Sequence, residues 1–220
     1  MPGALAPLGA GFRPLIFALL RGLDAEPDER AVTLVVTWLD LLATWNAKID
    51  LTAARSAREL VDLMLADAVV LARHEPPRAA VVDVGSGAGG PGLALGLLRP
   101  DLFLTLVEPL AKRVSFLRTV LGHFGAAPSE GGTMRVIRAK GEDLASGGEV
   151  FDSAVARATL PPAAWLDLAA RMVSPGGSVW VLLAREPAPA TKEWKIETEE
   201  RYRWPLTGVE RRALRYRRVP

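Results

Sequence analysis

The chain has 220 residues, of which 50% are hydrophobic and 24% are charged, so it can form a globular core and is neither disordered nor collagen-like. It contains no cysteine and only two histidines, which excludes disulfides, thiol catalysis, zinc–thiolate and iron–sulfur sites, and we expect no metal. The net charge is +2, but the last twenty residues contain seven arginines and one glutamate. Such a basic tail indicates either a phosphate-bearing partner or an edge strand protected by charge.

The chain has no run of about 18 apolar residues, the length needed to cross a membrane. The apolar stretch at residues 14–20 is short and lies between Arg13 and Arg21, so it predicts neither a transmembrane helix nor a signal peptide. We therefore expect a cytoplasmic protein without a membrane partner.

The first third of the chain is predicted to be helical, with helices at residues 13–23, 28–46 and 57–74. Asp28 is the expected N-cap of the second helix. Apolar residues recur in that helix at spacings of three and four: Leu34, Trp38, Leu41, Leu42 and Trp45. We expect this face, with both of its tryptophans, to pack in the core rather than to stack on bases.

The rest of the chain alternates strands and helices with short connections. Strands are expected at residues 79–84, 102–107, 134–139, 151–156 and 178–184, and helices at 93–98, 112–122 and 161–173. Two later strands, 194–202 and 211–218, are expected to form an antiparallel edge. This order predicts an α/β fold with a mostly parallel sheet and helices on both faces. We expect residues 1–75 to form a helical extension of a core at 76–220, within one structural unit.

A glycine-rich stretch follows the first expected strand. Gly85, Gly87 and Gly90 satisfy the G-x-G-x-x-G pattern, which lets the backbone turn sharply and approach a ligand closely. Glu108 ends the next strand, where an acid can accept hydrogen bonds from two ribose hydroxyls. The alternative for the glycine-rich stretch is a purely structural turn. The alternative for Glu108 is a solvated carboxylate at a strand end.

Two further loops favour a methyltransferase over a dehydrogenase. They follow the third and fourth strands, at residues 140–143 and 156–158, and nucleoside-binding methyltransferases use successive loops at these strand ends. Asp83, within the glycine motif, suits the same class. No residue stands out to handle a hydride, so a nicotinamide-dependent dehydrogenase is a distant alternative.

Four stretches together resemble the bacterial small-subunit rRNA guanine-N7 methyltransferases, the glucose-inhibited division protein B family. The family patterns are W-N-K-x-x-N-L-T, D-V-G-S-G-A-G-F-P-G, L-[VL]-[DE]-x-x-x-K-R-x-x-F-L and F-D-x-[VI]-x-[SA]-R-A. The matching stretches are residues 45–52 (WNAKIDLT), 83–92 (DVGSGAGGPG), 106–117 (LVEPLAKRVSFL) and 151–158 (FDSAVARA).

The resemblance implies a Rossmann-like class I methyltransferase with a seven-stranded sheet. It implies S-adenosylmethionine as the cofactor and 16S rRNA or the small ribosomal subunit as the partner. It places the cofactor on Asp83, Gly85, Ser86, Gly87, Gly90, Glu108, Gly141, Glu142 and Arg157. It makes Asn46, Arg55, Lys112 and Arg113 candidates for RNA contact. Arg157 is also the candidate nearest to the point of methyl transfer, and no catalytic base is assigned because guanine N7 carries no proton.

The chain departs from the family at several positions. Leu63 stands where the family has a histidine, residues 66–67 read Ala-Asp in place of Asp-Ser, and Asp50 replaces an asparagine. Gly90 replaces a bulky residue, and residues 184–185 replace a Lys-Gly pair. These changes leave open a different RNA, protein or small-molecule substrate, or a non-catalytic RNA-binding module. We expect a monomer, and the modified nucleotide stays open.

Overall fold

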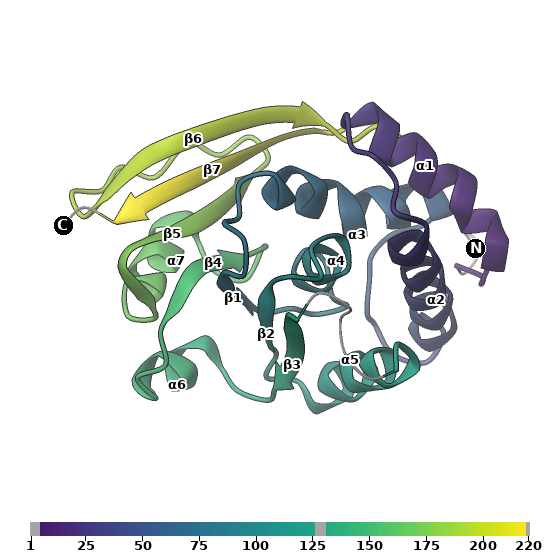
Figure 1. Cartoon of the computed structure of the whole chain (residues 1–220), viewed down its shortest axis with the longest axis horizontal. Helices are drawn as coiled ribbons and strands as arrows, with labels where there is room; N and C mark the ends of the chain where they lie inside the picture. Colours follow the sequence, from purple (N-terminus) through teal and green to yellow (C-terminus); the bar gives the residue numbers. More distant parts are fainter. Residues whose placement is uncertain (1–4, 126–130, 219–220) are drawn as a thin grey trace.

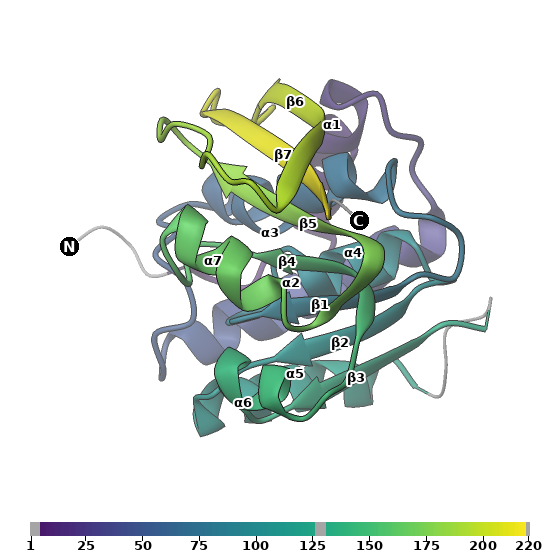
Figure 2. The ribbon, with the colours of Figure 1, turned by 90° about the vertical axis from the view of Figure 1, so that its left-hand side faces the viewer.

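The computed structural model describes residues 5–125 and 131–218. Their seven strands form one sheet. The strands are β1 (Ala80–Val84), β2 (Phe103–Val107), β3 (Thr133–Ile137), β4 (Phe151–Ala156), β5 (Val173–Leu183), β6 (Trp194–Arg203) and β7 (Glu210–Arg218). They lie in the order β3-β2-β1-β4-β5-β7-β6, and Figure 2 shows this order from β3 at the bottom to β6 and β7 at the top.

Strands β1 to β5 run parallel, whereas β7 runs antiparallel to both β5 and β6. The register pairs Val84 with Val107 and Asp83 with Val155, so β1, β2 and β4 end together. We call this side of the sheet the carboxyl edge. Open parallel sheets bind their ligands at this edge.

Helices cover both faces of the sheet. They are α1 (Arg13–Gly22), α2 (Glu29–Asn46), α3 (Ala57–Ala72), α4 (Gly92–Leu98), α5 (Ala111–His123), α6 (Gly141–Ser146) and α7 (Pro162–Ala169). Figure 1 shows α6 and α7 on one side of the sheet and α2, α3 and α4 on the other. The buried residues accordingly form two clusters, one around Trp38 and Leu65 and the other around Trp165 and Tyr216. The predicted fold class, including the antiparallel edge, is confirmed.

Helix α2 packs as its sequence predicts. The carboxylate of Asp28 caps the helix by accepting a hydrogen bond from the backbone N–H of Ala31 at 2.7 Å. Trp38 is fully buried, and its indole N–H donates to the carbonyl of Ala88 at 2.9 Å. Trp45 meets the ring of Phe116 edge-on, with 5.7 Å between ring centroids. The apolar face of α2 is therefore core, and its tryptophans do not form a stacking platform.

The short apolar stretch near the N-terminus lies in α1. Ile16, Leu19 and Leu20 are buried against the other N-terminal helices. Within the described ranges, no helix is both long and apolar enough to cross a membrane.

The boundary between α7 and β5 differs from the prediction. The helix predicted for residues 161–173 ends at Ala169, and β5 already begins at Val173, which pairs with Phe151. Residues 174–177, which separate the predicted helix from the predicted strand at 178–184, lie inside β5, where Gly176 has a φ of 75°. Pairing with β4 therefore outweighs the local preference of Ser-Pro-Gly-Gly for a turn.

Helix α6 was predicted as a loop. A Cβ on Gly141 would lie 2.8 Å from Cγ1 of Val84 and 2.9 Å from Cδ2 of Leu168. The start of the helix therefore packs so closely on β1 and α7 that only glycine fits. A helix of six residues is too short to show a helical period in the sequence.

The turn between β6 and β7 is anchored to α3 by a buried carboxylate. Asp62 is fully buried and accepts hydrogen bonds from the backbone N–H of Leu206 at 3.2 Å and of Thr207 at 2.8 Å. The hydroxyl of Thr207 donates to the same carboxylate at 2.7 Å. The guanidinium of Arg58 donates to the carbonyl of Leu206 at 2.7 Å. These contacts fix the C-terminal hairpin to the N-terminal helices.

Replacing Asp62 tests this anchor. Asp62→Ala leaves three donors at the turn without their acceptor and is expected to lower the free energy of unfolding by about 1–3 kcal/mol, measured by urea denaturation. Asp167→Ala, at an exposed position of α7, is the matched control and is expected to change it by less than about 0.5 kcal/mol. Equal effects of the two substitutions would contradict the anchor.

Candidate functional site

The glycine loop turns at the carboxyl edge, between β1 and α4. Gly85, Gly87 and Gly89 have positive φ values of 79°, 56° and 111°. A Cβ on Gly85 would lie 2.5 Å from Oγ1 of Thr159, which follows β4. The loop therefore requires glycine for its backbone conformation and for its approach to the neighbouring strand end.

Glu108 lies against this loop. It follows β2, its side chain is buried, and one carboxylate oxygen accepts a hydrogen bond from the backbone N–H of Gly87 at 3.0 Å. The other oxygen accepts from the N–H of Leu110 at 2.9 Å. These two bonds hold the carboxylate in one orientation, so it is not a solvated strand-end acid.

Asp83 is buried beneath the glycine loop. Its Oδ2 accepts a hydrogen bond from the backbone N–H of Gly92 at 3.2 Å, and a Cβ on Gly92 would lie 2.4 Å from the same oxygen. Its Oδ1 is buried and has no hydrogen-bond partner within the described part of the chain. Burial raises the pKa of Asp83 to about 6, against the opposing effect of the positive charge of Arg157. Ser86, also buried, donates to the carbonyl of Asp83 at 2.9 Å.

Gly141 and Glu142 begin α6, close to the carboxyl end of β3. Gly141 is buried against β1, whereas Glu142 is exposed. The carboxyl edge therefore brings together the glycine loop, Glu108, Asp83 and the start of α6.

Arg157 directly follows β4 but points into the protein. Its guanidinium donates to the carbonyl of Leu63 and to Oδ2 of Asp67, the latter at 3.2 Å. Oδ1 of Asp67 accepts from the hydroxyl of Tyr202 at 2.8 Å and from the indole N–H of Trp204 at 3.2 Å. Arg157 therefore forms a largely buried ion pair with α3 and is not a surface arginine.

Asp67 is the residue of this site that the sequence did not reveal. It was noted only as a departure from the family pattern, although a second aspartate, Asp62, lies on the same apolar helix. Two acids within the apolar stretch at residues 60–72 of this helix are a signal of buried hydrogen-bonded carboxylates, because unpaired ones are too costly to bury. The signal does not name their partners, which lie more than 80 residues away in the chain.

The RNA-contact candidates divide in two. Asn46, Lys112 and Arg113 line a common hollow of about 580 Å³, together with Lys48 and the exposed side chain of Leu110. Within it, the amide oxygen of Asn46 accepts hydrogen bonds from two backbone N–H groups of the following loop, at 2.9 and 3.0 Å. We call this the lysine hollow.

Arg55 is not among the residues that line the lysine hollow. It precedes α3, and its backbone N–H donates to the carboxylate of Glu59 at 2.6 Å.

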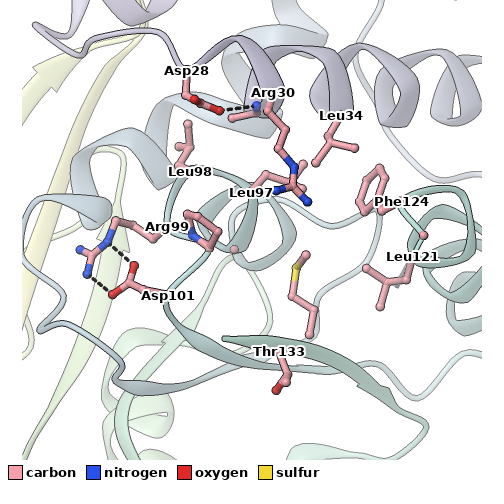
Figure 3. A pocket seen from close by; sticks show the side chains of 15 residues that line it. Asp28, Arg30, Leu34, Leu97, Leu98, Arg99, Asp101, Leu121, Phe124 and Thr133 are labelled. Carbon is pink, nitrogen blue, oxygen red and sulfur yellow. Dashed lines mark hydrogen bonds and ion pairs between the residues drawn. The ribbon is translucent and has the colours of Figure 1, made fainter. Parts of the chain in front are cut away.

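A cavity of about 600 Å³ lies away from the glycine loop, among α2, α4, α5 and the start of β3 (Figure 3). Arg30 reaches from α2 toward Leu97, and Arg99 pairs with Asp101 beside them. The hydrogen bond from Arg99 lowers the pKa of Asp101 to about 2. This cavity lies at the amino ends of the strands, on the side of the sheet opposite the carboxyl edge. Its large volume therefore does not mark the predicted cofactor site.

The position of Arg157 explains one departure from the family. A Cβ on Gly90 would lie 3.0 Å from the carbonyl oxygen of Met64 and 3.1 Å from Nη2 of Arg157. Main-chain atoms of α3 cannot easily move, so a bulky residue does not fit at position 90 while Arg157 takes this position.

Substitution of Gly90 tests this packing. Gly90→Ala is expected to lower the free energy of unfolding by about 1 kcal/mol, and Gly90→Phe by about 1–3 kcal/mol, because both overpack α3 and Arg157. Gly122→Ala is the control, since a Cβ there meets no atom within 4 Å and should stabilise α5 by about 0.5–1 kcal/mol. A Gly90→Phe protein as stable as the original would show that the space exists.

Comparison with solved structures shows the fold. A Burkholderia thailandensis 1,6-didemethyltoxoflavin-N1-methyltransferase, solved with S-adenosylhomocysteine, superposes with a TM-score of 0.57 at 15% identity. That match covers 90% of this chain and 93% of the other. TrmN from Thermus thermophilus superposes with a TM-score of 0.51 at 19% identity, over 73% of this chain and 48% of the other.

Comparison of sequences shows the family. The family model for GidB, rRNA small subunit methyltransferase G, matches residues 32–212. The ribosomal RNA small subunit methyltransferase G of Anaeromyxobacter dehalogenans strain 2CP-C is 31% identical, over 91% of this chain and 96% of its own. The protein of the same name from Halorhodospira halophila is 35% identical, over 77% of this chain and 78% of its own. With the glycine loop and its acids in place, the chain belongs to the GidB family of rRNA small subunit methyltransferases.

Proposed function

We propose that this protein transfers a methyl group from S-adenosylmethionine to N7 of a guanine in 16S rRNA. The family match identifies it as an S-adenosylmethionine-dependent rRNA methyltransferase. The observation that carries the proposal is the fixed carboxylate of Glu108, held against the glycine loop at the carboxyl edge. We further expect a cytoplasmic monomer that acts on the small ribosomal subunit or its RNA.

The residues at the carboxyl edge fit the cofactor. Glu108 has lone pairs beyond those used by its two backbone donors, so it can accept hydrogen bonds from ribose hydroxyls. The unpartnered Oδ1 of Asp83 can accept a hydrogen bond from the cationic amino-acid part or from an intervening water. Gly85, Gly87 and Gly90, with the backbone around Ser86, would line the cofactor, and Gly141 and Glu142 would flank the adenine.

The chemistry asks little of the protein beyond positioning. When bound, S-adenosylmethionine supplies a methyl group activated by a sulfonium. Guanine N7 attacks with a free lone pair and releases no proton, so the protein needs no general base. Its residues must orient the base and exclude water. We propose that Arg157, fixed by Asp67, shapes the wall beside the point of transfer.

The lysine hollow is the proposed contact for RNA near the cofactor. Lys112 and Arg113 lie in the first turn of α5, a few residues after Glu108, and Lys48 and Asn46 line the same hollow. Positive side chains beside the cofactor loop suit the phosphate backbone of RNA. The two hydrogen bonds of Asn46 to its own loop support a role in shaping the hollow. Arg55 stays a candidate for RNA contact outside this hollow.

Removal of Glu108 tests the cofactor site. Glu108→Ala is expected to weaken S-adenosylmethionine binding by about 1–3 kcal/mol in isothermal titration calorimetry, because ribose hydroxyls lose their acceptor and the loop loses an anchor. Glu26→Ala is the control. Glu26 is an exposed acid far from Glu108 in the sequence, so its loss should leave the affinity for S-adenosylmethionine unchanged. Unchanged affinity in Glu108→Ala would remove Glu108 from the site.

Asp83 predicts a pH dependence with a definite sign. Its pKa is raised from 3.8 to about 6 in the folded protein, so its proton stabilises the fold below pH 4 and this contribution is lost as the pH rises through about 6. Binding of a cationic cofactor favours the ionised carboxylate, so affinity should rise as the pH increases from 5 to 7 and then level off. Calorimetry on Asp83→Asn should give a flatter profile; the same rise in that variant would assign it to another group.

Methyl transfer itself tests the function. Purified protein is incubated with labelled S-adenosylmethionine and small-subunit rRNA lacking the family's modification, as naked RNA and as assembled subunits. Label on guanine N7, located by digestion and mass spectrometry and lost in Glu108→Ala, is the expected result. Label on another nucleotide would change the product, and cofactor binding without any label would redirect the search to other substrates.

A further inference from the structure

The arginines of the C-terminal hairpin fall into two groups. Arg215, Arg217 and Arg218, in the second half of β7, make structural contacts. Arg217 donates three hydrogen bonds of 2.7, 2.9 and 3.1 Å to the carboxylate of Glu197, and Arg218 donates to the carbonyl of Ala170 at 2.8 Å. This group is accounted for by packing within the hairpin and against the end of α7.

The second group lines a hollow at the opposite end of the hairpin. The hollow has a volume of about 390 Å³. Its lining residues are Ala184, Arg201, Tyr202, Arg203, Glu210, Arg211 and Arg212. We call it the arginine hollow.

The arginine hollow opens at the carboxyl edge. Ala184 directly follows β5, and β6 runs in the same direction as β5 because both are antiparallel to β7. The end of β6 at Arg203 and the start of β7 at Glu210 therefore lie at the edge where β1 and β4 end. Tyr202 connects the hollow to the site through Asp67, which holds Arg157.

The positive charge of the hollow is only partly compensated. Arg201 pairs with Glu199 at 2.8 Å and Arg203 with Glu210 at 2.7 Å, yet the arginine side chains are 73% and 70% exposed. Exposed ion pairs contribute little to stability, so a phosphate can exchange for these carboxylates. Arg212 shares Glu199 with Arg201, and Arg211 interacts electrostatically with Glu186, so four arginines face three glutamates.

Protection of a sheet edge explains only part of this arrangement, because Arg201 and Arg203 lie on β6 whereas the other two arginines do not. Edge protection needs charges on the outermost strand, which is β6. Arg211 and Arg212 instead belong to β7, an inner strand between β5 and β6. Arg211 lies over the ring of Trp204, with 4.3 Å from the guanidinium carbon to the ring centroid, which holds its guanidinium in place.

The strand order places the two basic hollows on opposite sides of the cofactor loops. The lysine hollow lies beside the end of β2, and the arginine hollow lies at the ends of β7 and β6. The glycine loop and Arg157 follow β1 and β4, which lie between them. Five strand spacings from β2 to β6 amount to roughly 24 Å, a length that several nucleotides can span.

We propose that the arginine hollow binds the phosphate backbone of the substrate RNA on the side of the methyl-transfer point opposite the lysine hollow. The inference rests on the proposed function, because it takes RNA as the substrate. Arginine suits this role because its guanidinium binds phosphate through two parallel hydrogen bonds. Contacts of this kind position the RNA without reading its sequence.

The test compares two double variants with the same loss of charge. Arg201→Gln/Arg203→Gln removes two exposed arginines of the hollow. Lys192→Gln/Lys195→Gln removes two exposed lysines at the other end of β6 and is the control. Binding of 16S rRNA and of assembled small subunits is measured over a range of salt concentrations, together with KM and kcat for methyl transfer and the Kd for S-adenosylmethionine.

The arginine variant is expected to bind RNA about tenfold more weakly at low salt, and its slope of log K against log salt should be smaller by about 1.4–1.8. KM for the RNA should rise while the Kd for S-adenosylmethionine stays unchanged. The lysine variant should behave as the original protein. An unchanged salt slope and KM in the arginine variant, or equal changes in both variants, would overturn the inference.

Two further results distinguish a failure of the proposed function from a failure of the RNA-binding role of the arginine hollow. If the original protein binds the RNA but transfers no methyl group to it, the proposed function fails, while the salt slopes still test the hollow. If the double variant has a lowered Tm, Arg201→Gln alone replaces it, because Arg212 still pairs with Glu199. That single variant should lower the slope by about 0.7–0.9, and an unchanged slope contradicts the proposal.

Discussion

The hydrogen bonds of the buried carboxylate of Asp67 connect the three parts of this protein. One oxygen holds the guanidinium of Arg157 at the end of β4, and the other holds Tyr202 and Trp204 of the C-terminal hairpin. The carboxylate itself belongs to α3, among the N-terminal helices. A buried charge is stable only when paired and hydrogen-bonded, so each of the three parts depends on the other two.

This connection accounts for two departures from the family, the Ala-Asp pair at residues 66–67 and Gly90. Asp67 lies one position after the place where the family has its aspartate, and it provides the counter-charge for Arg157. Arg157 and the backbone of Met64 then occupy the space that a bulky residue at position 90 would need. Gly90 is therefore a consequence of where Arg157 lies. The departures do not remove the cofactor residues, since Glu108 and the glycine loop keep their mutual hydrogen bonds.

Much of the fold and the centre of the site could be predicted from the sequence because both are local in character. The alternation of apolar strands and helices predicted the parallel sheet. Glycines after the first strand and an acid at the end of the second strand predicted a site around Gly87 and Glu108. The partners of Asp62 and Asp67 could not be predicted, because they lie far away in the sequence and carry no periodic signal. The short helix α6 and the early start of β5 were missed because close packing and strand pairing decide them.

The role of the basic tail likewise could not be predicted from the sequence, because it depends on contacts between distant segments. Its composition suggested a phosphate-bearing partner or a protected edge, and only the strand directions separate its arginines into structural ones and those that line the hollow at the carboxyl edge. The connection among the N-terminal helices, the C-terminal hairpin and the end of β4 depends on the pairing of Asp67 with Arg157.

The measurement that tests this pairing most directly is a double-mutant cycle on the free energy of unfolding, with Asp67→Ala, Arg157→Ala and the double variant. We predict that the free energy of unfolding falls less in the double variant than in the two single variants combined, by about 1–3 kcal/mol. Simple additivity would contradict it, because the two side chains would then not stabilise each other.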